Sequence, residues 1–207
     1  MLFRSTPKRK GSDYHHGDLK SAAILAARNL IESGGTSALG MRRVAQKIGV
    51  TPPALYRHFE SIEDLLCEVS LSARQELAEL MIKRRSAVVQ RSDKRKSELD
   101  KFLAIGEAYL DFAEKHPRLF EVAFGSQSNK QISDYNEQAW EILNESIESL
   151  VTLGMTSKSK RETAPLMAWS AVHGLATLIT NNAVAQGDLK FFRKAVMDGI
   201  QDSLIMK

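Results

Sequence analysis

Cysteine is nearly absent from this chain of 207 residues, in which Cys67 is the only one. A single thiol excludes an internal disulfide framework and suits a reducing compartment, so we expect a cytoplasmic protein. Glycine and proline are sparse, at 12 and 5 residues, and the alternation of apolar and polar residues that is typical of strands is missing. Because good helix formers dominate instead, the sequence predicts an all-α fold.

Signals for export, membrane insertion and catalysis are also missing. The first 18 residues lack the apolar core of a signal peptide. The run 164–186 has no Asp, Glu, Lys or Arg, but His173, Asn181 and Asn182 would be costly in lipid, so a buried dimer interface explains it better. The histidines are scattered, and no His-Glu-x-x-His, paired cysteines or Gly-rich phosphate loop occurs. We therefore expect no metal, no cofactor, no membrane and no enzyme.

The net charge of +4 is unevenly distributed. Residues 1–59 hold 10 Lys and Arg against 3 Asp and Glu, whereas residues 60–207 hold 19 against 22. A basic N-terminal part joined to a mildly acidic C-terminal part indicates a polyanionic partner at one end only. The polar arm 1–16, with Lys8, Arg9 and Lys10, either follows DNA phosphates or is a solvated tail.

The stretch 41–59, MRRVAQKIGVTPPALYRHF, has the pattern of two short helices joined by a tight turn. A small residue at Ala45 lets the helices approach, and Gly49 supplies a left-handed turn. Thr51 is placed to cap the second helix, with Pro52 at its first position, where a missing N–H does no harm. We interpret the stretch as a helix-turn-helix, whose second helix fits a DNA major groove.

Further apolar periodicity predicts seven more helices and hence about nine in all. They are expected at 18–33, 61–89, 99–115, 119–124, 135–153, 163–186 and 188–205, with loops at 90–98 and 126–134. The chain thus divides into a basic arm (1–16), a helix-turn-helix domain (17–60) and a C-terminal helical domain (61–207). The helix 61–89 is expected to link the two domains.

Two segments resemble the TetR family of bacterial transcriptional regulators: YHHGDLKSAAILAARNLIESGG (14–35) and MRRVAQKIGVTPPALYRHFESIEDLL (41–66). They are similar to the family's first helix and to its helix-turn-helix signature. The resemblance implies a homodimer formed through the last two helices, which binds double-stranded DNA at a pseudo-palindromic operator. It also implies a repressor that a small-molecule effector in the C-terminal domain releases.

The resemblance assigns the DNA contacts to the outer side of the motif, with Leu55 and Phe59 turned inward. The sequence departs from the family pattern at two places, and these departures predict weaker affinity for DNA or a larger contribution of the arm to DNA binding. Gly40 stands where the family has a capping Ser or Thr, and Ser61, Ile62 and Glu63 stand where it has a phosphate-pairing Lys. The residues expected at DNA are Arg42, Arg43, Thr51, Pro53, Ala54, Tyr56, His58 and Ser61.

In the second half, HPRLFEVAFG (116–125) and AWSAVHGLATL (168–178) resemble the branch whose ligand domain is named for a Trp-His-Gly motif. Trp169 and His173 share a helical face, and Gly174 is expected to open room beside them. Aromatic residues at this spacing form either an ordinary core or the wall of a largely apolar effector cavity. The candidate lining is Tyr109, Phe112, Phe120, Phe124, Trp140, Met167, Trp169 and His173.

Two other functions stay open. One is a DNA-binding dimer without a small-molecule effector, controlled by a protein partner or by its own concentration. The other is a helical ligand-binding protein that has lost DNA binding, which the departures from the family pattern keep in view.

Overall fold

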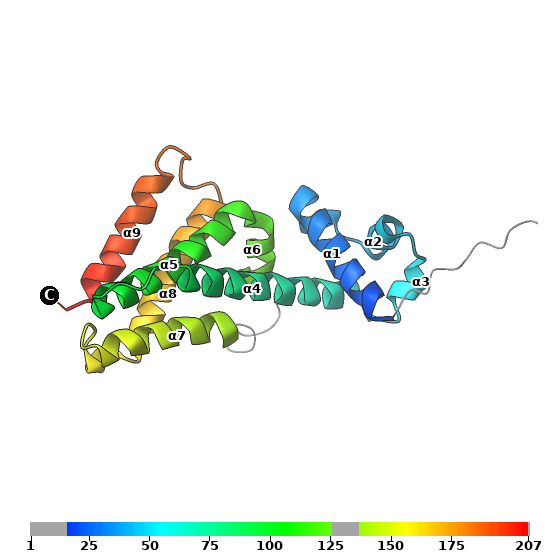
Figure 1. Ribbon diagram of the computed structural model, residues 1–207. Coiled ribbons are helices and arrows are strands. Elements are labelled where there is room, and N and C mark those ends of the chain that lie inside the picture. The colour runs from blue at the N-terminus through cyan, green and yellow to red at the C-terminus, as the bar shows by residue number, and fades with distance from the viewer. Residues whose placement is uncertain (1–15, 126–136, 207) are drawn as a thin grey trace, which may run out of the picture.

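A computed structural model describes residues 16–125 and 137–206, and these ranges contain helices and no strand (Figure 1). The expected all-α class is therefore confirmed for the described part of the chain. The expected loop 126–134 and all of the expected arm except His16 lie outside it. The α-helices are α1 (His16–Gly34), α2 (Met41–Ile48), α3 (Pro52–Leu55), α4 (Ile62–Ser86), α5 (Lys94–Lys115), α6 (Pro117–Phe124), α7 (Glu137–Thr152), α8 (Thr163–Thr180) and α9 (Leu189–Leu204).

The first three helices form a small group whose apolar side chains belong to the same core as those of α4 and the C-terminal helices. Ala27 and Ile31 of α1, Val44 of α2 and Leu55 of α3 are completely buried, and Phe59 is nearly so. Helix α1 contacts both α2 and α3. A helix as short as α3 is not stable in isolation, because each turn must offset the cost of nucleation. Packing on α1 therefore holds the helix-turn-helix in shape.

Helix α4 joins this group to the C-terminal helices, as Figure 1 shows. Its cap is Ser61, whose Oγ accepts a hydrogen bond from the backbone N–H of Asp64 at 3.1 Å. Along the same helix, Leu65, Leu77 and Met81 are buried, and α4 contacts α1 as well as α5, α6 and α7. A shift of α4 against its neighbours therefore changes contacts on both sides of the junction.

Helix α5 lies at the centre of the C-terminal helices and contacts α4, α6, α7, α8 and α9. It ends at Lys115, and α6 ends before Gly125, as the sequence predicts. Helix α6 begins at Pro117, two residues before the predicted start, because proline fits the first position of a helix. Helix α9 packs mainly on α8 and lies at the end of the molecule away from α1–α3 (Figure 1).

The start of α5 differs from the prediction. The helix begins at Lys94, so the charged stretch 90–98 is only partly a loop. Asp93 caps it by accepting a hydrogen bond from a backbone N–H three residues later. Ser97 is completely buried, and its Oγ accepts from the backbone N–H of Arg91 at 2.8 Å. The first turn of α5 is thus stabilised by capping hydrogen bonds. It contains no apolar residue, so apolar periodicity could not predict it.

Two helix ends also differ. Helix α8 ends at Thr180 rather than near 186, because the chain turns at Asn182, whose φ is 55°. Asparagine adopts this left-handed conformation more readily than most residues do. Helix α4 ends at Ser86 rather than at 89. Among the described helices, none is long and apolar enough to cross a membrane.

Candidate functional sites

The first candidate site is the predicted helix-turn-helix. Helix α2 ends at Gly49, which has the left-handed φ of 73° and ψ of 30°. The backbone N–H of Val50 donates to the carbonyl of Ala45 at 3.0 Å and closes the turn. The side chain of Ala45 is 1% exposed, so a larger residue would push the two helices apart. The predicted turn is confirmed at these residues.

The second helix of the motif is shorter than its periodicity suggests. Regular α3 ends at Leu55, and the backbone N–H groups of His58 and Phe59 both donate to the Leu55 carbonyl, at 2.9 and 3.0 Å. Thr51 occupies the capping position with extended backbone, but its side chain makes no capping hydrogen bond. The expectation that its hydroxyl caps α3 is therefore wrong, and this hydroxyl is not used up by the helix.

The residues expected at DNA lie on the helix-turn-helix or, for Ser61, at the start of α4, and they differ in exposure. Tyr56 is 55% exposed, and the guanidinium of Arg43 donates to the carbonyl of Ala38 at 3.1 Å. Leu55 and Phe59 are buried, as expected. The exposed members are Arg42, Arg43, Thr51, Pro53 and Tyr56, and the half-buried ones are Ala54, His58 and Ser61.

Two further basic residues lie on the same motif and are missing from the residues expected there. Lys47 is exposed in the last turn of α2, and Arg57 is exposed beside Tyr56. Both are part of the basic excess of residues 1–59, which was the available signal. With Arg42 and Arg43 they give the motif the positive surface that a polyanion needs.

The start of α4 is less favourable for a phosphate. Ser61 Oγ is engaged with the N–H of Asp64, and the Asp64 carboxylate accepts from the N–H of Glu60 at 3.1 Å. Glu63 adds a second carboxylate in this turn. These acids neutralise the positive end of the helix dipole and repel a phosphate. Any contact of Ser61 with DNA must therefore work against them.

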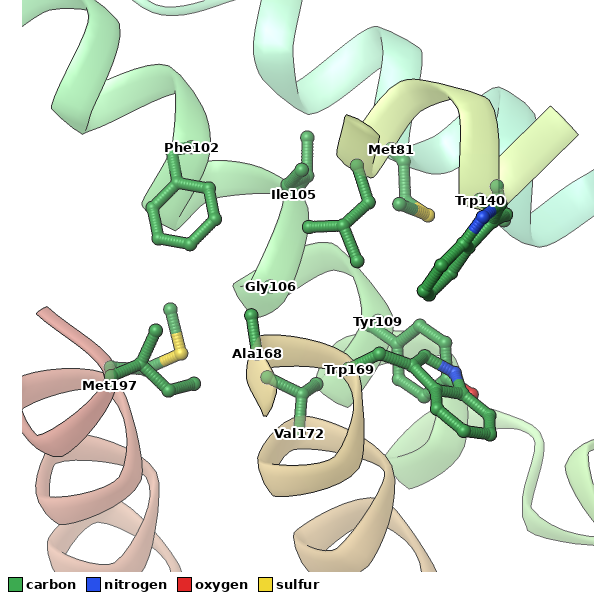
Figure 2. Close-up of a pocket in the computed structure, with 13 residues that line it drawn as sticks. Met81, Phe102, Ile105, Gly106, Tyr109, Trp140, Ala168, Trp169, Val172 and Met197 are labelled. Carbon is green, nitrogen blue, oxygen red and sulfur yellow. The ribbon is translucent and has the colours of Figure 1, made fainter. Parts of the chain in front are cut away.

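The second candidate site is an apolar cavity between α4, α5, α7, α8 and α9 (Figure 2). The cavity has a volume of about 40 Å³, measured as the space that the centre of a water molecule can reach. No side chain with a formal charge is part of its wall. The wall consists of Met81, Phe102, Ile105, Gly106, Tyr109, Ala139, Trp140, Leu143, Ala168, Trp169, Val172, Met197 and Ile200.

Three of the eight residues expected in a pocket line this cavity: Tyr109, Trp140 and Trp169. Phe112 is buried elsewhere, with its ring 5.4 Å from that of His116, and Met167 is 37% exposed. The remaining ten wall residues are aliphatic, small or, in Phe102, an aromatic that the sequence did not single out. Nothing in their spacing separates them from ordinary core residues.

The other three expected residues, Phe120, Phe124 and His173, surround Tyr109 behind the cavity wall. The Tyr109 hydroxyl and His173 Nδ1 are 2.9 Å apart, and the imidazole stacks on the indole of Trp169 with ring centres 5.0 Å apart. The rings of Phe120 and Phe124 each lie 5.7 Å from that of Tyr109. The cluster holds the tyrosine and tryptophan of the wall in place.

Burial sets the protonation of this cluster. Desolvation lowers the pKa of His173, and it raises the pKa of Tyr109 well above the ordinary value for a phenol. The imidazole is therefore neutral and the phenol protonated at neutral pH. In that state the hydrogen bond between the Tyr109 hydroxyl and His173 Nδ1 joins two uncharged groups, and the tautomer of the imidazole sets which of them donates.

Gly174 does not open room beside the pair. It is exposed, and nothing lies within 4 Å of the position a Cβ would take. One residue past His173 the helix has turned by about 100°, which carries the glycine to the outer face of α8.

The outer faces of α8 and α9 carry large exposed apolar side chains. Phe191 is 71% exposed and Leu166 is 54% exposed. Large exposed apolar side chains on two helices that pack together favour a protein interface there. The group consists of Leu166, Met167, Leu178, Phe191 and Phe192. Within the described ranges, no three His, Cys, Asp or Glu side chains are grouped so as to hold a metal ion.

Comparisons with known proteins find matches for both parts of the chain. Residues 23–69 match the family model described as bacterial regulatory proteins, tetR family. Residues 102–198 match the model described as tetracyclin repressor-like, C-terminal domain. The uncharacterized HTH-type transcriptional regulator YobS of Bacillus subtilis (strain 168) is 24% identical over 163 residues, which cover 76% of this chain and 77% of that protein.

Solved structures share the fold. A protein with unknown function from Rhodococcus sp. RHA1 has a TM-score of 0.79 at 20% identity, covering 95% of this chain and 100% of its own. A bacterial regulatory protein in the tetR family from Rhodococcus RHA1 has a TM-score of 0.65 at 16% identity, covering 90% and 96%. At these identities the likeness shows the fold alone.

Proposed function

Because this chain belongs to the TetR family of bacterial transcriptional regulators, we propose that it is a homodimeric repressor released from its operator by a small-molecule effector. The observation that carries the proposal is the exposed, basic helix-turn-helix joined by α4 to a bundle with an internal apolar cavity. The proposed division is an arm at 1–16, a DNA-binding domain at 17–60 and an effector-binding and dimerisation domain at 61–207. The proposed place of action is the cytoplasm, where the DNA lies.

The proposed DNA contacts divide into two kinds. Thr51, Tyr56 and His58 face a major groove, where they touch phosphates or a thymine methyl more readily than they pair with a base edge. Arg42 and Arg43 at the start of α2 contact the backbone beside the groove. Pro53 and Ala54 supply close apolar contact, and Ser61 lies at the margin.

The proposed dimer forms through α8 and α9. Their exposed apolar side chains suit a four-helix bundle across a two-fold axis. That symmetry would place two helix-turn-helix motifs on successive major-groove faces of a pseudo-palindromic operator.

The proposed effector acts through the cavity wall. Met81 on α4 and Met197 on α9 both belong to that wall. A molecule that fits only one arrangement of α4 favours that arrangement, and it does so by its difference in affinity for the two states. Trp169 lies in the wall and His173 stacks on it, which supports this location. The family model that matches this part of the chain is described as tetracyclin repressor-like, so the Trp-His-Gly branch stays a prediction.

The test of the proposal is selection of bound fragments from random duplex DNA by the purified protein near physiological salt. The expected result is a shared inverted repeat whose affinity falls steeply as salt rises, because phosphate contacts release counterions. Tyr56→Ala is expected to lose that enrichment and to keep its thermal stability, since the side chain is exposed. No enrichment at any salt would instead favour a ligand-binding protein that has lost DNA binding.

One observation favours a second function, a DNA-binding dimer controlled without a small molecule. The space of about 40 Å³ is small, while ligand sites commonly measure about 300–1,000 Å³ in total volume. Screening a compound library against the selected operator complex separates the two, because only an effector-controlled repressor has a compound that releases it.

A further inference from the structure

The cavity has one polar feature that its apolar wall leaves unsatisfied. The indole N–H of Trp169 is buried, and it has no hydrogen-bond partner among the residues that the structure describes. Buried N–H groups in proteins are nearly always paired, because desolvation without a partner is unfavourable. This group therefore points to a partner that is not part of the described chain.

The neighbouring polar side chain, Tyr109, does not form a hydrogen bond with the indole N–H of Trp169. Figure 2 shows the indole nitrogen of Trp169 and the hydroxyl of Tyr109 at the same end of the cavity. Burial raises the pKa of Tyr109, and a weak contact between its hydroxyl and the indole N–H of Trp169 lowers that pKa in part. The geometry nevertheless falls short of a hydrogen bond. The Tyr109 hydroxyl already has a partner in His173 Nδ1, so the group at this corner that still lacks one is the indole N–H.

Water alone does not account for the whole of this space. A buried water typically makes 2–4 hydrogen bonds, and one water that bridges the Trp169 N–H and the Tyr109 hydroxyl oxygen reaches the lower limit. The other side chains of the wall are apolar, so the rest of the space of about 40 Å³ suits an apolar group. A charged occupant is disfavoured, because no wall residue carries a formal charge to compensate it.

We infer that the cavity binds an uncharged, mainly apolar molecule with one hydrogen-bond acceptor, such as a ketone, ester or ether oxygen, held by the Trp169 N–H. The inference rests on the proposed effector function and names the chemical class of the effector. Met81 and Met197 are the adaptable parts of the wall, so a molecule larger than the present space enters by changing their rotamers.

The chain carries its own reporter for this test. It contains 2 tryptophans, and both of them, Trp140 and Trp169, line the cavity. Tryptophan fluorescence therefore follows occupancy directly. Suitable probes are benzylacetone, butylbenzene and hydrocinnamate, which share a phenylalkyl frame and differ in carrying a ketone, no polar group or a carboxylate.

The expected result is that benzylacetone binds about tenfold more tightly than butylbenzene, the effect of one buried hydrogen bond, and that hydrocinnamate binds weakest. Trp169→Phe keeps an aromatic ring and removes the N–H, so the preference for the ketone over the hydrocarbon is expected to disappear, with Trp140 as reporter. Trp140→Phe is the matched control and is expected to keep the preference, with Trp169 as reporter.

Equal binding of benzylacetone and butylbenzene by the unsubstituted protein, or tightest binding of hydrocinnamate, would overturn the inference without any variant. Binding of none of the probes up to their solubility limits would also overturn it. The selection of operator DNA needs no ligand. It therefore tests the proposed DNA binding independently of these ligand-binding results.

Discussion

The imidazole of His116 contacts the carboxylate of Glu32, with Nδ1 and Oε1 2.5 Å apart, and so joins the start of α6 to the last turns of α1. Arg118 donates to the backbone carbonyl of Glu32 at 2.8 Å. His116 Nε2 lies 3.7 Å from Glu76 of α4, which also pairs with Arg28 of α1. We call these five residues the junction network. It connects the helix-turn-helix group to the bundle without involving the apolar core.

Replacement of Glu32 by Gln is expected to loosen this connection. The groups are partly exposed, so the free energy of unfolding should fall by no more than about 1 kcal/mol. Amide hydrogen exchange in α1 is expected to accelerate by up to about fivefold, with α8 unchanged. Glu148→Gln, which removes an exposed partner of Arg161 within the bundle, is the control and should leave α1 unaffected. Equal exchange in both variants would contradict a connecting role.

Replacement of Gly49 by Ala is expected to destabilise the helix-turn-helix. At a φ of 73° an added Cβ is strained by about 1–2 kcal/mol, even though no atom lies within 4 Å of its position. For a chain of this size that corresponds to a drop of several degrees in the melting temperature. Gly187→Ala, at a position with open space and no positive φ, should melt like the unsubstituted protein. A drop of the same size at Gly187 would show that loss of glycine alone is responsible.

Replacement of Gly106 by Ala is expected to narrow the cavity without unfolding the protein. The new Cβ would lie 2.8 Å from Met197 Cε, the end of a flexible side chain that moves at little cost. Alanine also favours the helix by up to about 1 kcal/mol. Thermal unfolding should therefore show equal or higher stability, while benzylacetone binding weakens several-fold. Gly199→Ala, with open space at its Cβ, is the helical control and should leave binding unchanged.

Stability is expected to depend on the protonation of His173. Its folded pKa is lowered by burial, so below the unfolded value of about 6.5 the unfolded chain binds a proton that the folded protein does not. The contribution of His173 to the free energy of unfolding is therefore fully present above about pH 6.5. It decreases as the pH falls below that value, by at most about 1.4 kcal/mol per pH unit. The groups around the imidazole are Tyr109, Trp169, Phe120 and Phe124.

Melting curves from pH 7.5 to 5 test this dependence. His173→Asn, whose side-chain oxygen can accept from Tyr109 in place of Nδ1, should flatten the decline in stability. His58→Asn, which changes a half-buried histidine of the helix-turn-helix, should retain it. An unaltered decline in the His173 variant would assign the acid sensitivity to other groups.

Replacement of Phe191 by Asp is expected to weaken the proposed dimer. A phenylalanine buried in an interface contributes about 1.5–3 kcal/mol, so the dissociation constant should rise at least tenfold, as measured by sedimentation equilibrium. Val89→Asp changes a side chain that is 76% exposed and lies outside α8 and α9, and it should not alter association. Identical behaviour of the two variants would place the dimer contact elsewhere.

The sequence by itself determined the all-helical class, the helix-turn-helix and several helix ends. These features depend on local chemistry. Gly49 permits a left-handed turn that other residues resist, Pro117 forces the break between α5 and α6, and the buried residues of α1 and α2 recur at helical spacing. Each of these effects acts within a few residues of its cause.

Only the tertiary structure decided which residues line the cavity and which connect the two groups of helices. Met81, Gly106 and Met197 line the same cavity because α9 packs against helices that lie far from it in the sequence. Apolar residues in a cavity wall also follow the same sequence pattern as apolar residues in a core. The contact of His116 with Glu32 likewise spans 84 positions. Local sequence sets helix formation through short-range interactions, whereas cavities and junctions depend on how whole helices pack, which no short-range pattern specifies.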